Sequence, residues 1–352
     1  MENTMKKLIS ILAMLGLPAS AWADFSVSPY TILDLSYNNV SNAAHKDGGS
    51  GNRGTVRVNS SYASRWGAKA NYSFLDDQEL FVQYEQAIRK EDGDIKTGLD
   101  KRYLRVALVG YRSPLGIVRY GQDYGISCWA LDYDPLMGRL VSSSSQLYFR
   151  DQPFVGHALS YDSPEIGPFR ARFQYSTEQH ARGMLFDVKK TYGATLTYTR
   201  GDISVQAGMD EQYSPDGDLD LLFGYSRFSY LAGSWQLDDL TLLAGYSQLE
   251  ARGAPVGAPK RAGHAWFGGR YRMSPTWAAS ASLYQTDARQ LGEASMLAGL
   301  LEYAASKHLS IWGSAAYMVN GGHSSFAVNG VDTPLPGQSQ TSLSVGMTYI
   351  YR

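Results

Sequence analysis

Apolar and polar residues alternate in short segments along almost the whole chain after residue 23. In one such segment Phe173 and Tyr175 alternate with Arg172 and Gln174. A period of two places successive side chains on opposite faces of an extended strand, so each segment has an apolar face and a polar face. Sixteen such segments can be counted. Each is about ten residues long, the length that a tilted strand needs to cross a bilayer.

The connections between these segments alternate in length. Short turns such as Asp76-Asp77 and Ser274-Pro275 follow one end of the segments, and long polar loops follow the other. This organisation is typical of a closed transmembrane β-barrel, whereas a soluble β-sandwich requires neither the aromatic strand ends nor a polar face of Gly, Thr, Ser and Arg. About sixteen strands leave a water-filled interior, the lumen. The predicted long loops cover residues 39–63, 89–100, 121–156, 178–190, 210–228, 250–263, 286–295 and 320–340.

The N-terminus has the order of a secretory signal peptide. Lys6-Lys7 precede an apolar run from Leu8 to Leu17, and Ala21-Trp22-Ala23 forms a small-x-small cleavage site. The run is too short to span a bilayer. We therefore predict a signal peptide over residues 1–23 and a barrel domain over 24–352. The net charge of −1 also argues against nucleic acid as a partner.

One long stretch, from Gly121 to Phe154, interrupts the strand pattern. Pro135, Gly138 and a run of four serines discourage a helix of any length there. A long segment without regular structure in an ordered protein is usually functional or disordered. We predict that it folds into the lumen and narrows it. Cys128, the single cysteine, excludes an intramolecular disulfide and is predicted to be a packed small side chain.

Several motifs, in this order and spacing, resemble the Gram-negative general porin family over essentially the whole mature chain. The resemblance implies a sixteen-stranded barrel, usually a homotrimer, whose third loop folds inside so that loop carboxylates face arginines of the wall. The motifs are Pro29-Tyr30-Thr31-Ile32-Leu33-Asp34, Ser64-Arg65-Trp66-Gly67-Ala68-Lys69, Tyr120-Gly121-Gln122-Asp123-Tyr124-Gly125, Ser160-Tyr161-Asp162-Ser163-Pro164, and the hairpin from Tyr303 to Trp312.

The resemblance also implies candidate site residues. Arg65 matches a wall arginine within Ser-Arg-x-Gly, and Asp132 or Asp134 matches the acidic loop position, although both could instead cap Asx turns. The alternation places Arg105 and Arg119 on lumen faces. Arg105 is expected to share its face with Tyr103 and Ala107, opposite Leu104, Val106 and Leu108. The predicted constriction comprises Arg65, Lys69, Arg105, Arg119, Asp132 and Asp134, and Asp34, Arg170 and Arg172 are further predicted lumen charges.

Three positions depart from the family pattern. Ile32 stands where the family has a lysine, Gly138-Arg139 appear where a second loop carboxylate is expected, and the chain ends in Tyr351-Arg352 rather than Phe. The constriction should therefore be more basic than that of a cation-selective relative.

Catalytic and metal-binding patterns are missing from the sequence. The six histidines are scattered, and neither a nucleophile elbow nor a phosphate loop is present. We predict an outer-membrane channel without enzyme activity or cofactor, through which small hydrophilic solutes and ions diffuse with a weak preference for anions. Outer-membrane lipid and lipopolysaccharide are the expected surroundings. A substrate-selective channel for a sugar or an anion is the main alternative, and a barrel enzyme or adhesin is a further one.

Overall fold

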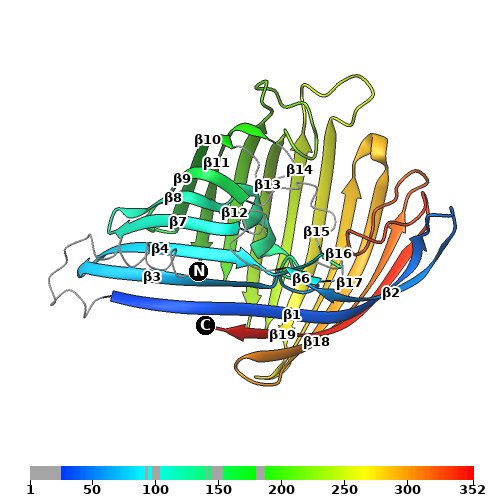
Figure 1. Cartoon of the computed structure of the whole chain (residues 1–352), viewed down its shortest axis with the longest axis horizontal. Coiled ribbons are helices and arrows are strands. Elements are labelled where there is room, and N and C mark those ends of the chain that lie inside the picture. The colour runs from blue at the N-terminus through cyan, green and yellow to red at the C-terminus, as the bar shows by residue number, and fades with distance from the viewer. Residues whose placement is uncertain (1–24, 92–93, 97–103, 140–141, 144–153, 180–186) are drawn as a thin grey trace.

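The computed structural model describes residues 25–91, 94–96, 104–139, 142–143, 154–179 and 187–352. The predicted signal peptide lies outside the described residues, and so does much of the second half of the predicted loop. Within the described part, long antiparallel strands form one continuous curved sheet (Figure 1). The domain boundary at residue 24 therefore stays a prediction.

Nineteen strands are described. They are β1 (Phe25–Ala44), β2 (Ser50–Val58), β3 (Arg65–Leu75), β4 (Gln78–Ala87), β5 (Arg89–Glu91), β6 (Asp94–Lys96), β7 (Leu104–Ser113), β8 (Gly116–Tyr124), β9 (Phe154–Asp162), β10 (Phe169–Gln179), β11 (Val188–Arg200), β12 (Ile203–Tyr213), β13 (Arg227–Leu237), β14 (Leu240–Glu250), β15 (Arg261–Arg272), β16 (Trp277–Asp287), β17 (Glu293–Ala304), β18 (Leu309–Asn320) and β19 (Gln340–Tyr351).

The first and last strands close the sheet into a barrel. β1 pairs with β19 from Thr31↔Tyr351 to Val40↔Ser342. The two halves of β1 pair with β3 and β2 respectively, so β2 and β3 occupy one position of the barrel, interrupted by residues 59–64. With β5 and β6 forming a separate ribbon, the barrel has sixteen positions. Closure removes the sheet edges, as lipid requires. The predicted sixteen-stranded antiparallel barrel is confirmed.

The two faces of the strands differ as the alternation predicts. On β1 Leu33 and Leu35 are both 46% exposed on the outside, whereas Ile32 and Asp34 are 2% exposed on the inside. On β10 Phe173 is exposed outside, opposite to the inward arginines of that strand. The large apolar side chains therefore cover the surface that lipid would contact.

Two details of the loops differ from the predictions. The predicted loop over residues 39–63 is mostly strand, because β1 and β2 continue as a long hairpin around residues 45–49. The predicted loop over residues 121–154 begins later, since Gly121–Tyr124 belong to β8, and it contains the 3-10 helix η3 (Ile126–Tyr133) that Pro135 and Gly138 were expected to prevent. Both of those residues follow the helix, where they end it instead of breaking it.

The helices of the described chain are brief. Besides η3 there is a single turn, η5 (Arg289–Leu291). None in the described part has the length and apolar character of a membrane-spanning helix.

Candidate pore constriction

The segment that follows β8 lies inside the barrel, against the inner wall formed by β12–β15. The Ser127 N–H donates a hydrogen bond to the Asp210 carboxylate at 2.7 Å. The Tyr133 hydroxyl lies 2.9 Å from Ser204 Oγ, and the Trp266 indole N–H donates to the Tyr133 carbonyl at 2.9 Å. Burial raises the pKa of the Tyr133 hydroxyl, which therefore stays neutral. η3 is thus fixed to the wall opposite its point of entry.

Asp134 anchors the turn after η3. Its side chain has no exposed surface, and Oδ1 accepts a hydrogen bond from the Tyr284 hydroxyl at 2.6 Å. The two carboxylate oxygens also accept the backbone N–H groups of Leu136 and Gly138, each at 3.0 Å. This is the Asx-turn arrangement that was the alternative for this residue. The Asp134 carboxylate therefore does not face the channel, contrary to its predicted place in the constriction.

The loop then continues along the same side of the interior to β17. The Arg139 guanidinium forms an ion pair with Glu302 on β17 and lies 4.7 Å from the centre of the Tyr62 ring. The Ser142 N–H donates to the Val328 carbonyl at 2.9 Å. Between β8 and β17 the described part of the loop therefore crosses the interior.

A cluster of charged groups forms around Glu85, on the inner face of β4. Arg65 Nε lies 3.1 Å from one carboxylate oxygen, and Arg105 Nε donates to the other at 2.6 Å. The Tyr30 hydroxyl donates to the same carboxylate at 2.9 Å, and Arg105 also donates to the Tyr124 hydroxyl at 2.7 Å. Two predicted constriction arginines thus meet at one carboxylate.

The side chain of Arg105 points to the inner face of the barrel, although the alternation of residues along β7 does not place it there. Val106 and Leu108 are buried on the inside of β7, and Val109 is 48% exposed on the outside, so the predicted phase of this strand is wrong. The pairing of β4 with β7 shifts between Glu85 and Gln86, and Arg105 is the extra residue at this irregularity. A bulge of this kind redirects a side chain. Arg105 therefore points toward Glu85 on the inner face because of this bulge, and not because of the residue alternation from which its direction was predicted.

A second cluster forms around Asp162, at the end of β9. Arg119 donates to both carboxylate oxygens at 3.0 and 3.1 Å, and Arg172 donates to both at 2.7 and 2.8 Å. Arg119 also pairs with Asp123 at 3.0 Å, and Arg170 lies 3.7 Å from Asp162. These bidentate pairs hold the arginines in defined positions. The predicted lumen faces of Arg119, Arg170 and Arg172 agree with this geometry.

Two hollows adjoin these clusters inside the barrel. One, of about 410 Å³, is lined by Arg65, Lys69 and Gln83 among others. The other, of about 340 Å³, is lined by Arg170, Arg172 and Asp132, whose side chain is exposed. Both clusters of inward charges therefore border space large enough for water. Asp132 is the acidic residue of η3 that lines the second hollow.

Asp34 lies on the inner face of β1, as predicted, but it is covered. Its Oδ1 accepts the backbone N–H groups of Ser60 and Ser61 at 2.6 and 2.9 Å, and Thr348 donates to Oδ2 at 2.7 Å. This carboxylate holds the segment between β2 and β3 in place. It is a buried structural group and not an open lumen charge.

The six inward cations that were predicted from the sequence outnumber the carboxylates that lie among them. We use the term basic wall for the six inward cations on β3, β7, β8 and β10 that were predicted from the sequence. Four carboxylates accompany them: Glu85, Asp123, Asp162 and Asp132. The excess is two positive charges. The basic wall consists of Arg65, Lys69, Arg105, Arg119, Arg170 and Arg172.

The wall carboxylates were not predicted as site residues. Glu85, Asp123 and Asp162 each stand in an alternating segment or at its end, where nothing local distinguishes them from solvated charges. Their position next to the arginines depends on strand pairing. Cys128 is partly buried within η3. In the described ranges, no group of three or more His, Cys, Asp or Glu side chains could hold a metal ion.

Comparison with known proteins relates this geometry to a family. The sequence profile of the Gram-negative porin family matches residues 10–323. Outer membrane porin protein 32 of Delftia acidovorans is 26% identical over 225 residues, which are 61% of this chain and 62% of that protein. The matched part thus spans less than two thirds of the curated relative.

Solved structures share the fold. An anion-selective porin from Comamonas acidovorans has a TM-score of 0.76 at 18% identity, covering 93% of this chain and 100% of that one. The trimer form of OmpT from Vibrio cholerae has a TM-score of 0.65 at 14% identity, covering 93% and 99%. With the profile match over most of the sequence and the closed sixteen-stranded barrel, the chain belongs to the Gram-negative porin family.

Proposed function

We propose that this protein is a passive, water-filled channel of the outer membrane for small hydrophilic solutes and ions, with a weak preference for anions. The observation that carries the proposal is the basic wall, whose inward cations exceed their carboxylate partners by two. Excess fixed charge of one sign attracts ions of the opposite sign into a narrow aqueous path. The family and the barrel fold point to a channel rather than an enzyme.

The constriction is formed, in this proposal, by the basic wall on one side and η3 on the other. Arg65, Lys69, Arg105 and Arg119 supply positive charge, and Asp132 supplies the opposing negative charge. Opposed rows of charge create a transverse field that orients dipolar solutes. Arg170 and Arg172 extend the positive side along β10.

The surroundings of the channel follow from the same family. The family and the fold support an outer-membrane location. We propose that the predicted signal peptide is cleaved during export and that outer-membrane lipid and lipopolysaccharide surround the barrel. We infer a homotrimer, since one structurally similar porin was solved in a trimer form. Neither a cofactor nor energy coupling is needed for diffusion through a pore.

Reconstitution of the mature protein into a planar bilayer tests this function. We expect current steps in groups of three and, in a salt gradient, a reversal potential whose sign shows that anions pass more readily than cations. Added solutes should reduce the current according to their size alone. A clear preference for cations would contradict the selectivity. Block by one sugar or anion at low concentration would indicate a substrate-selective channel. Absence of current from folded protein would favour the enzyme or adhesin alternatives.

A further inference from the structure

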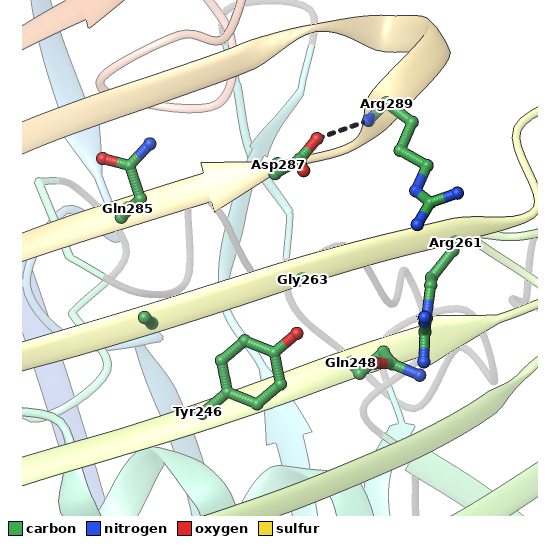
Figure 2. Close-up of a pocket in the computed structure, with 8 residues that line it drawn as sticks. Tyr246, Gln248, Arg261, Gly263, Gln285, Asp287 and Arg289 are labelled. Atoms are coloured by element: carbon green, nitrogen blue, oxygen red, sulfur yellow. Dashed lines mark hydrogen bonds between the residues drawn. The ribbon is translucent and has the colours of Figure 1, made fainter.

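A hollow of about 280 Å³ lies on the outside of the barrel, at the ends of β14, β15 and β16 (Figure 2). Tyr246 faces outward at 51% exposure and pairs with Ala265, which in turn pairs with Gln285. Further along the same face come Phe267 and Leu283, 58% and 59% exposed. The hollow therefore lies on the surface that lipid would cover. We call it the outer hollow.

The outer hollow is at the boundary between apolar and charged surface. Phe267 marks the apolar side, and Gly263 is four residues further along β15, a distance of about 13 Å. Arg261 is two residues beyond that, where β15 joins the long loop. Side chains at this height of a membrane barrel lie at the level of lipid headgroups.

Two arginines line the hollow without a carboxylate partner of their own. Figure 2 shows Arg261 and Arg289 on the same side of it. In the part of the chain that the structure describes, neither guanidinium has a carboxylate within ion-pair distance, whereas Arg252 nearby pairs with Glu250 at 3.3 Å. Asp287 uses one carboxylate oxygen to accept the Arg289 backbone N–H at 2.8 Å. The hollow carries a net charge of about +1 from these side chains.

The floor of the outer hollow is made of small residues. A side chain at Gly263 would begin 2.7 Å from the Tyr246 hydroxyl, so glycine allows the tyrosine to lie across the strand. Ala265 continues the floor toward the apolar surface, and Gln248 and Gln285 offer amide donors at the sides. The result is a polar recess with cationic and neutral donors that opens beside lipid.

We propose that the outer hollow binds a phosphate group carried by a glycolipid headgroup of the outer leaflet. Arginine binds phosphate through parallel charge-assisted hydrogen bonds, and the tyrosine and glutamine donors complete the coordination of its oxygens. The glycolipid's acyl chains would then lie over Phe267 and Leu283. The inference rests on the proposed outer-membrane setting and is independent of ion conduction.

The test uses mature protein folded in detergent. Binding of bisphosphorylated lipid A is followed by native mass spectrometry, in parallel with dephosphorylated lipid A and with inorganic phosphate as a competitor. The variant Arg261→Gln/Arg289→Gln removes both guanidinium groups from exposed positions. The matched control, Arg200→Gln/Arg272→Gln, removes the same charge from exposed residues at the opposite end of the strands. Gln248→Glu adds a negative charge to the hollow and keeps both arginines.

We expect the Arg261/Arg289 variant to bind bisphosphorylated lipid A roughly 30-fold more weakly, since each arginine near an anionic lipid contributes about fivefold in affinity. Gln248→Glu should weaken binding too, and the control pair should not. Three results would each overturn the proposal. They are unchanged binding of bisphosphorylated lipid A by the Arg261/Arg289 variant, binding of dephosphorylated lipid A as tight as that of the bisphosphorylated form, and complete displacement of lipid A by millimolar phosphate.

Conductance separates this site from the proposed function. The Arg261/Arg289 variant should conduct like the original protein in a neutral bilayer, because both residues lie outside the lumen. Protein that binds lipid A but does not conduct would contradict the channel and leave the lipid site supported. Protein that conducts but shows no phosphate-dependent binding of lipid A would support the channel and contradict the lipid site.

Discussion

At the scale of single residues, two carboxylates determine where the basic wall holds its guanidinium groups. Glu85 positions Arg65 and Arg105, and Asp162 positions Arg119 and Arg172. Neither carboxylate can neutralise both of its arginines. Each pair therefore keeps excess positive charge beside the lumen and holds it in a fixed geometry.

Replacing one wall arginine should shift the selectivity of the channel. In Arg65→Ala or Arg105→Ala, Glu85 keeps one arginine and the excess charge falls by one, so we expect the anion-to-cation permeability ratio to fall about twofold. Reversal potentials in a salt gradient measure it. Arg112→Ala is the control, because this arginine pairs with Glu79 near the short-turn end of β7 and is 55% exposed. An unchanged ratio would remove the mutated arginine from the constriction.

The two aspartates at the end of η3 should behave differently when changed. Asp132→Asn removes an exposed negative charge, so selectivity should move further toward anions with little loss of stability. Asp134→Ala leaves the Tyr284 hydroxyl and two backbone N–H groups without their acceptor, which should cost about 1–3 kcal/mol. Reversal potentials and urea unfolding of the two variants distinguish these effects. The assignment fails if Asp134→Ala shifts selectivity at unchanged stability.

At the scale of elements, the loop narrows the lumen only because it is bound to the wall. η3 and the turn after it contact β12–β16 through a few buried hydrogen bonds, including those from Trp266 and Tyr284. The bonds from Trp266 and Tyr284 are made across more than 130 positions of sequence. The loop therefore depends on the closed barrel for its position.

Weakening this attachment should widen the channel. Trp266→Phe/Tyr284→Phe removes the donors to the Tyr133 carbonyl and to the Asp134 carboxylate and leaves an aromatic ring at each position, so we expect larger and noisier single-channel currents. Trp312→Phe is the control, since it makes the same change in size but its indole N–H donates to Thr348 at 3.1 Å and not to a group of the loop. Equal currents in the double variant and the control would show that other contacts hold the loop.

At the scale of the whole molecule, the barrel separates a lipid-facing surface from an aqueous one along every strand. Leu196 and Thr197 are adjacent on β11, yet Leu196 is 52% exposed outside and Thr197 lines an inner hollow. One step along the chain therefore changes the solvent of a side chain from hydrocarbon to water.

The same arginine substitution at these neighbours should have opposite consequences. Leu196→Arg places a charge against lipid and should cost about 2–4 kcal/mol near the middle of the bilayer. Thr197→Arg should fold nearly as well as the original and add positive charge to the lumen. Folding into vesicles at graded urea concentrations measures both. Equal costs for the two variants would show that this part of β11 does not separate lipid from water.

The alternation of residues determined the fold class, the number of strands and most of their faces, because a membrane barrel leaves each side chain only two environments. It therefore also predicted the inward arginines of β3, β8 and β10. Only the tertiary structure decided the rest. The register shift that turns Arg105 inward, the pairing of arginines with Glu85 and Asp162, and the burial of Asp34 and Asp134 depend on contacts between distant segments. No local pattern carries that information, since strand register and loop docking are settled only when the barrel closes.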